Sequence, residues 1–118
     1  MIKKNKFEKI VAEAVDGLPD EFQRRMENVS ISVEDRPSEE IIRKQGIKSP
    51  VTLLGLYQGI PLKKRGVYYS NVLPDMITIY KEPIEMLCSN EDRIKERVKE
   101  VVMHELGHHF GMTEEDLA

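Results

Sequence analysis

The sequence predicts a single α+β domain over residues 1–118, with a small sheet of three to four strands. Three observations predict this class. Apolar residues recur at helical spacing near both ends of the chain, the middle holds short segments with strand character, and a length of 118 residues suits one domain. Two helices, three or four strands and a final helix together make an α+β domain.

The N-terminal part of the chain is expected to be helical. Over Lys3–Asp16 the apolar residues recur at spacings of three and four, and Gly17 and Pro19 then supply a stop. A short second helix should follow Pro19, with Phe22 and Met26 as its apolar positions.

Strands are expected over Asn28–Glu34, Thr52–Tyr57 and Asp75–Tyr80. The first of these alternates apolar and polar residues with a period of two and is rich in β-branched residues. Residues Val67–Leu73 are a candidate for a fourth, short strand. The polar stretch Ser38–Gly46 fits one or two helical turns or a loop.

A long final helix is expected after the helix signals that resume at Pro83. Ser89, followed by Asp92, resembles a capping box that opens a helix over Asn90–Phe110. The apolar side chains of its first turns form one stripe that should face the core, and one turn later Glu105 takes the centre of that stripe. A carboxylate aimed at the core is costly unless it has a partner or faces a cleft. The residues of the stripe are Ile94, Val98, Val101 and Val102.

Charge and hydropathy argue against several classes of protein. The chain has 18 Lys and Arg against 21 Asp and Glu, a net charge of −3 and a pI near 5.7, which disfavours nucleic-acid binding by bulk charge. The basic run Lys63–Gly66 is expected to be a solvated turn. No apolar run approaches the roughly 20 residues of a membrane span, and no signal-peptide core follows the basic N-terminus. With one cysteine, Cys88, the sequence predicts a cytoplasmic protein.

The final helix carries the strongest functional signal, His104-Glu105-Leu106-Gly107-His108. Histidines four residues apart lie on one helix face, so both imidazoles can reach one zinc ion. The glutamate between them is placed to accept a proton from a water that the metal activates. The motif therefore predicts His104 and His108 as ligands of Zn²⁺ and Glu105 as the catalytic base.

A third ligand is expected after this helix. Gly111 stands where a left-handed glycine can end the helix and reverse the chain, which would bring Glu114 back to the metal. The pattern H-E-x-x-H-x-x-G-x-x-E then matches the metzincin layout, with a carboxylate in place of a third histidine. Asp116 is the second candidate, and Glu115 is a further rival.

Several other side chains are weighed for the same chemistry. His109 is expected to pack or form hydrogen bonds rather than bind metal, because it lies on the wrong side of the helix. Cys88 is expected to be a small core residue. Four tyrosines are candidates to stabilise an oxyanion, and each is also suited to pack its ring on a strand: Tyr57, Tyr68, Tyr69 and Tyr80.

The ending of the chain resembles that of the small bacterial minimal zincins, a family of zinc-metallopeptidase-like proteins. The resemblance runs from about Phe7 onward and implies a zincin-like fold similar to a reduced matrix-metalloprotease core. In such a fold the metal helix lies under a small twisted sheet, with a shallow cleft above. Glu114 stands where Asp is usual in the family, and no Met-turn is expected after Gly111, unlike in larger metzincins. The resemblance is carried by Leu18-Pro19, Val29–Asp35, Leu53–Gly59, Leu73–Tyr80 and His104–Gly111.

The expected function is zinc-dependent hydrolysis of a peptide or protein substrate. One alternative is a zincin-fold module that binds zinc and has a regulatory or peptide-binding role, with little or no proteolysis. Another is a zinc endoribonuclease, but such enzymes typically lack the glutamate after the first histidine and use a third histidine. Neither a nucleic-acid partner nor a membrane is expected, and the sequence indicates no oligomeric state.

Overall fold

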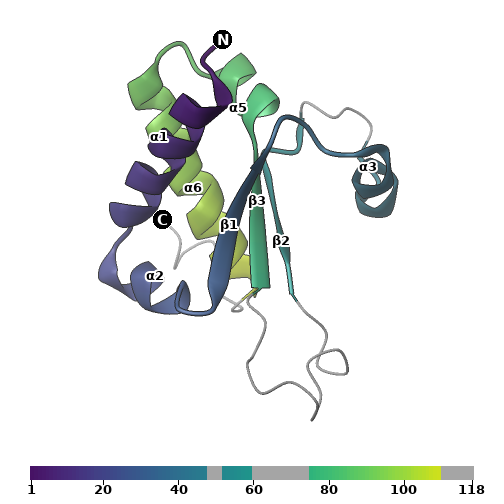
Figure 1. The fold of residues 1–118 in the computed structure, drawn as a ribbon. Helices are drawn as coiled ribbons and strands as arrows, with labels where there is room; N and C mark the ends of the chain where they lie inside the picture. Colours follow the sequence, from purple (N-terminus) through teal and green to yellow (C-terminus); the bar gives the residue numbers. More distant parts are fainter. Residues whose placement is uncertain (48–51, 60–74, 110–118) are drawn as a thin grey trace.

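The chain forms a three-stranded sheet with α1, α2 and α6 on one side and the short helix α3 on the other (Figure 1). The structure, a computed structural model, describes residues 1–47, 52–59 and 75–109. Within these residues the elements are α1 (Lys4–Asp16), α2 (Asp20–Arg25), β1 (Val29–Glu34), α3 (Glu39–Gln45), β2 (Gly55–Gln58), β3 (Asp75–Tyr80), α5 (Lys81–Leu87) and α6 (Glu91–His109).

The sheet is mixed, which together with the helices confirms the α+β class. Its strand order is β1-β3-β2, with β1 parallel and β2 antiparallel to the central strand β3. The register sets Ile31 of β1 and Tyr57 of β2 on either side of Ile77. The candidate fourth strand, Val67–Leu73, and the basic run Lys63–Gly66 lie outside the described residues.

Strand β2 begins later than the sequence predicts, and spans Gly55–Gln58 instead of Thr52–Tyr57. The reason is the length of its partner. Strand β3 ends at Tyr80, whose backbone N–H donates to the Leu54 carbonyl at 2.9 Å, so the ladder between the two strands begins there. A strand boundary of this kind depends on the neighbouring strand rather than on local residue preference.

The two N-terminal helices match their predictions. In α1 the buried side chains are Phe7, Ile10, Val11 and Ala14. The Gly17 backbone N–H donates to carbonyls of the last turn, and Pro19 then precedes the first residue of α2. Phe22 is the buried residue of α2, and Met26 packs beside it at the edge of the core.

The polar stretch after β1 forms helix α3, which resolves the choice between helix and loop. The Ser38 hydroxyl accepts a hydrogen bond from the Ile41 N–H at 3.2 Å, a helix cap that satisfies one free donor of the first turn. The helix ends at Gly46, which has a φ of 65°. Glycine adopts this left-handed conformation without steric cost.

Both C-terminal helices begin at residues other than those predicted. Helix α5 starts at Lys81, so Pro83 occupies its first turn, where a proline costs no hydrogen bond. Helix α6 is capped by Asn90, whose side-chain oxygen accepts from the Arg93 N–H at 2.9 Å. The expected capping box at Ser89 is therefore wrong by one residue, since asparagine caps as well as serine.

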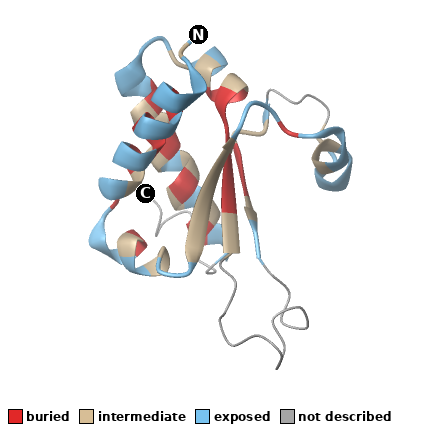
Figure 2. Ribbon diagram, viewed as in Figure 1, coloured by how far each residue is buried: buried red, intermediate tan, exposed pale blue. Residues whose placement is uncertain are grey.

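The core lies between α1, α6 and the sheet (Figure 2). In α6 the buried row is Ile94, Val98, Val102 and Leu106, spaced four residues apart, and Val101 is half-buried. The prediction that Glu105 takes the centre of this stripe is wrong, because Leu106 continues it with no exposed surface. A row of residues four apart winds slowly around a helix, so the buried face shifts along its length. Glu105 lies beside this row and is half-buried.

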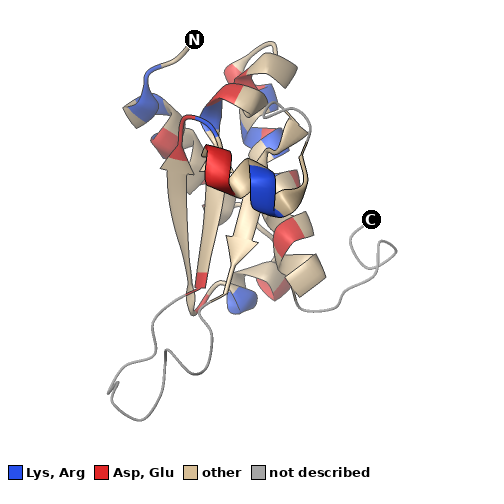
Figure 3. Cartoon of the chain, turned by 90° about the vertical axis from the view of Figure 1, so that its right-hand side faces the viewer, with Lys and Arg blue, Asp and Glu red and all other residues tan. Residues whose placement is uncertain are grey.

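Charged residues of both signs are interspersed over the helices, while the strands are mostly uncharged (Figure 3). Within the described ranges, no helix is long and apolar enough to cross a membrane.

Candidate functional site

His104 and His108 occupy the last two turns of α6 and are both exposed. Their ring centroids are 6.0 Å apart and the ring planes meet at 22°. This arrangement follows from the sequence, because residues four apart lie one above the other on a helix. The two imidazoles therefore face the same solvent-accessible region, as the spacing predicts.

Glu105 points from α6 toward strand β2. Its Oε1 accepts a hydrogen bond of 2.9 Å from the backbone N–H of Tyr57, a residue 48 positions away in the sequence. Burial raises the pKa of the Glu105 carboxyl, and this effect is partly offset by the Tyr57 hydrogen bond and by the charges of His108 and His104. The carboxylate holds a proton more readily than an exposed glutamate, which suits a group that takes up and releases a proton.

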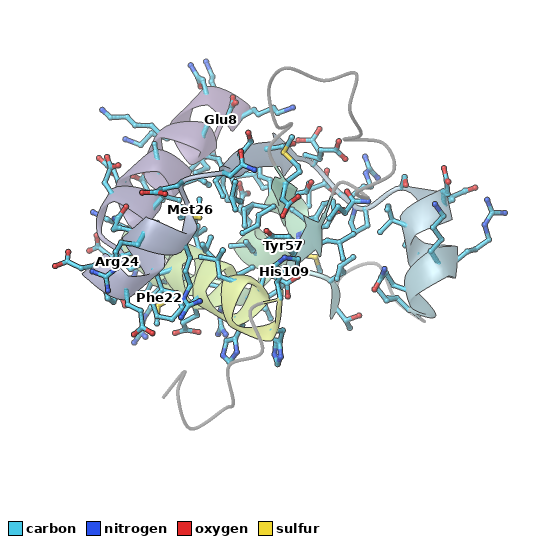
Figure 4. The ribbon with its side chains drawn as sticks, turned by 90° about the horizontal axis from the view of Figure 1, so that it is seen from below. Glu8, Phe22, Arg24, Met26, Tyr57 and His109 are labelled. Carbon is cyan, nitrogen blue, oxygen red and sulfur yellow. The ribbon has the colours of Figure 1, made fainter. Side chains whose placement is uncertain are left out.

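A polar cluster joins the end of α6 to the sheet next to Glu105. The Tyr57 hydroxyl donates to Asp75 Oδ2 at 2.7 Å, and the Tyr57 ring stacks on the His109 ring with centroids 4.0 Å apart at 15°. His109 Nε2 lies 3.8 Å from the same Asp75 oxygen. Figure 4 shows Tyr57 and His109 side by side at the C-terminal end of α6. His109 thus packs against the sheet, as expected for its side of the helix.

A cavity of about 290 Å³ adjoins His104 and Glu105, between α6 and the chain that enters β2. One of its walls is formed by α6, including the ion pair of Arg97 and Glu100, and the other by the residues leading into β2. A larger cavity of about 560 Å³ lies at the opposite end of α6, around Cys88 and Ile94, and its lining includes neither His104 nor Glu105. The residues lining the first cavity are Thr52, Leu53, Leu54, Gly55, Arg97, Glu100, Val101, His104 and Glu105.

The imidazoles of His104 and His108 fit a zinc ion. Two imidazoles one helical turn apart, at 6.0 Å between centroids, leave room for one ion with zinc–nitrogen bonds of about 2.0–2.1 Å. No group of three His, Cys, Asp or Glu side chains within residues 1–47, 52–59 and 75–109 is arranged to hold a metal. The predicted third ligand Glu114, its rivals Glu115 and Asp116, and Gly111 lie outside these ranges.

Of the tyrosines considered for the site, Tyr57 lies there and Tyr80 does not. Tyr80 is 2% exposed at the opposite end of β3 from Asp75, and its ring packs in the interior. Tyr68 and Tyr69 lie outside the described residues. Cys88 is half-buried against the core, in keeping with its expected packing role.

Sequence reasoning missed two features of the site, the carboxylate of Asp75 and the backbone N–H of Tyr57. Asp75 is the first residue of a strand, and no sequence pattern around it predicts a functional role. A backbone donor leaves no mark in a residue pattern at all. Both are recognised only when β2, β3 and α6 are placed together.

Comparison with known proteins supports the fold and the family. The chain matches no curated protein sequence. Its fold is similar to that of a conserved hypothetical protein, TTHA0227, from Thermo thermophilus, with a TM-score of 0.55 and 19% identity over 92% of this chain and 94% of the other. At that identity the likeness concerns the fold alone. Residues 26–118, more than half of the chain, match the family model of zincin-like metallopeptidases. The expected family is confirmed: the chain belongs to the zincin-like metallopeptidases.

Proposed function

We propose that this protein is a zinc-dependent hydrolase of peptide bonds, with His104, His108 and Glu114 as metal ligands and Glu105 as general base. The observation that carries the proposal is the placement of Glu105. It lies between two exposed histidines one turn apart, is half-buried, and borders a cavity next to strand β2. The zincin-like family supports the same reaction class.

When bound, zinc supplies a Lewis acid that acidifies a water molecule and polarises a carbonyl group. Glu105 takes the proton of the attacking water and passes it to the leaving amine. The Tyr57 N–H, 2.9 Å from Oε1, holds one carboxylate oxygen in place and leaves Oε2 to act as the proton acceptor. The raised pKa of Glu105 brings its proton affinity closer to that required of an acid–base group at neutral pH.

The cavity beside His104 and Glu105 is the proposed place for a substrate side chain. Its volume of about 290 Å³ accommodates one amino-acid side chain, and the Arg97–Glu100 pair lies on its α6 wall. The substrate backbone would then run past Glu105, within reach of the proposed base.

Metal content of the purified full-length chain tests the ligand assignment. We expect about one zinc per chain, because two histidines and a carboxylate are a typical catalytic set. His104→Ala and His108→Ala should each lose the metal, whereas Glu100→Ala, an exposed change on the same helix, should retain it. Absence of zinc from wild-type protein supplied with the ion at neutral pH would refute the assignment.

The role of Glu105 is tested by Glu105→Gln. This variant should keep its zinc and lose roughly 10²-fold or more of the hydrolysis of a mixed peptide library, the usual scale of general-base catalysis. Glu96→Gln makes the same chemical change at an exposed position of the same helix that does not line the cavity beside Glu105, and it should leave turnover unchanged. Loss of zinc in Glu105→Gln would recast Glu105 as a ligand or as a support for one.

A second candidate is a zinc-binding module that holds an extended peptide without cleaving it. The position of β2 favours it, because β2 ends the strand order among the described residues. Strand edges of this kind can pair with an extended partner. Zinc-loaded protein that binds library peptides and releases no fragments would favour this candidate over hydrolysis.

A further inference from the structure

Tyr57 is the point where three elements of the fold meet. It belongs to β2, its hydroxyl reaches Asp75 at the start of β3, and its ring covers His109 at the end of α6. Its backbone N–H, in turn, donates to Glu105 one turn earlier in α6. Tyr57 thus contacts α6 through its ring and its backbone N–H, and it reaches the start of β3 through its hydroxyl.

These contacts are of kinds that fix direction as well as distance. A hydrogen bond from a hydroxyl to a carboxylate is shorter and stronger than one between neutral groups, and 2.7 Å is in the range of such bonds. Stacked rings 4.0 Å apart at 15° limit both tilt and sliding. The Asp75 side chain is only 14% exposed, a position that a carboxylate tolerates when donors face it.

The cluster acts on the part of α6 that carries the proposed chemistry. His109 directly follows His108, and Glu105 lies four residues before His109 on the same side of the helix. Because the helix backbone is hydrogen-bonded throughout, holding His109 against β2 also sets the position of Glu105 relative to the Tyr57 N–H.

We propose that Tyr57, Asp75 and His109 form a clamp that positions Glu105. The clamp holds the last turns of α6 against β2, so that the Tyr57 N–H engages one oxygen of the Glu105 carboxylate. The three residues are positioning residues: none is assigned a contact with substrate or metal. The consequence for hydrolysis rests on the proposed function, whereas the geometry of the clamp does not.

Nuclear magnetic resonance of the full-length chain tests the clamp without any substrate. Tyr57→Phe removes the hydroxyl and keeps the ring and the backbone N–H. We expect the Tyr57 amide hydrogen to exchange about tenfold faster, because loss of a hydrogen bond to a charged acceptor loosens this end of β2. The ¹³C resonance of the Glu105 carboxyl should move in the same variant, whereas exchange at Ile77 and Ile79 in β3 should not change.

Two comparisons separate positioning from general stabilisation. Tyr80→Phe makes the same chemical change in a buried tyrosine away from the clamp and should leave the Tyr57 amide and the Glu105 resonance as in wild type. Asp75→Asn keeps an oxygen that accepts from the Tyr57 hydroxyl but removes its charge, so it should change both signals less than Asp75→Ala, which should reproduce Tyr57→Phe.

The clamp is refuted if Tyr57→Phe leaves the Tyr57 amide exchange and the Glu105 resonance unchanged. It is also refuted if Tyr80→Phe alters them equally. In an active enzyme, Tyr57→Phe should lower kcat and leave KM nearly constant. If the wild-type chain shows no hydrolysis but Tyr57→Phe produces the expected exchange and resonance changes, the proposed function is overturned and the clamp is supported.

Discussion

Glu105 illustrates how one residue acquires an unusual proton affinity from its surroundings. Half-burial removes water from the carboxylate and raises its pKa, while the Tyr57 N–H and the neighbouring histidines act in the opposite direction. The balance leaves a carboxyl group that is partly desolvated but still hydrogen-bonded. Such a group costs less than an unpaired buried charge and remains able to exchange a proton.

Tyr80 provides a test of the link between burial and proton affinity outside the candidate site. Burial raises the pKa of the Tyr80 hydroxyl above 10, and the negative charge of Glu34, its register neighbour on β1, raises it further. The folded chain therefore keeps this proton to higher pH than the unfolded chain does. The stabilising contribution is present below pH 10 and is lost as the pH rises through the raised value.

We predict that the free energy of unfolding falls more steeply above pH 10 in wild type than in Tyr80→Phe. Urea unfolding at several pH values between about 8 and 11 measures the difference. Below the ordinary tyrosine pKa, the difference in free energy of unfolding between wild type and Tyr80→Phe should be independent of pH. If the free energies of unfolding of the two proteins change in parallel over the whole pH range, the assignment of a raised pKa to Tyr80 is contradicted.

At the scale of elements, the approach of α6 to β2 depends on a glycine. A Cβ built on Gly55 would lie 2.5 Å from Cγ1 of Val101 and 3.3 Å from the Thr78 carbonyl oxygen. The first distance is shorter than real Cβ contacts, and a β-branched valine on a helix has little freedom to turn away. A bare backbone at position 55 therefore lets β2 lie close enough to α6 for the Tyr57 N–H to reach Glu105.

Gly55→Ala should destabilise the protein by about 1–3 kcal/mol, the usual cost of overpacking. Val101→Ala in the same chain removes the clashing methyl group, so the double variant should lose less stability than the sum of the two single changes. Gly59→Ala is the matched control, because a Cβ there meets only ordinary contacts at 3.7 Å and beyond. Additive losses in urea unfolding would show that the Gly55–Val101 contact does not limit the packing.

At the scale of the whole molecule, the proposed metal site joins α6 to the segment that follows it in the chain. The Gly111 reversal is proposed to bring Glu114 nearest the metal, whereas Asp116 must double back with a shorter side chain. Loss of a direct ligand costs more than the 10–100-fold in affinity typical of residues that only support a ligand. The order in which alanine substitutions at Glu114, Glu115 and Asp116 weaken zinc binding therefore identifies the third ligand.

We expect Glu114→Ala to weaken zinc binding by more than 100-fold, Asp116→Ala by 100-fold at most, and Glu115→Ala hardly at all. Competition against a chromophoric chelator ranks the three variants. If Asp116→Ala is the most damaging, the third ligand is Asp116 and the zincin assignment still stands.

The sequence by itself determined the class of the domain, the position of its main helices and the core of its three strands. It also determined the one-turn spacing of His104 and His108 with Glu105 between them. These features follow from local regularities, namely helical and strand periodicity, caps and stops, which act over a few residues. The zincin-like family was predicted differently, from the resemblance of His104–Gly111 and of four segments further upstream to the minimal zincins.

Only the tertiary structure decided what surrounds that motif. Strand β2 begins at Gly55 because β3 ends opposite Leu54, and the buried stripe of α6 continues through Leu106 because it follows the neighbouring elements. Tyr57 became a site residue, and Tyr80 did not, through contacts between residues far apart in the chain. Such contacts depend on how strands and helix are placed against one another, and neither residue preference nor local periodicity carries that placement.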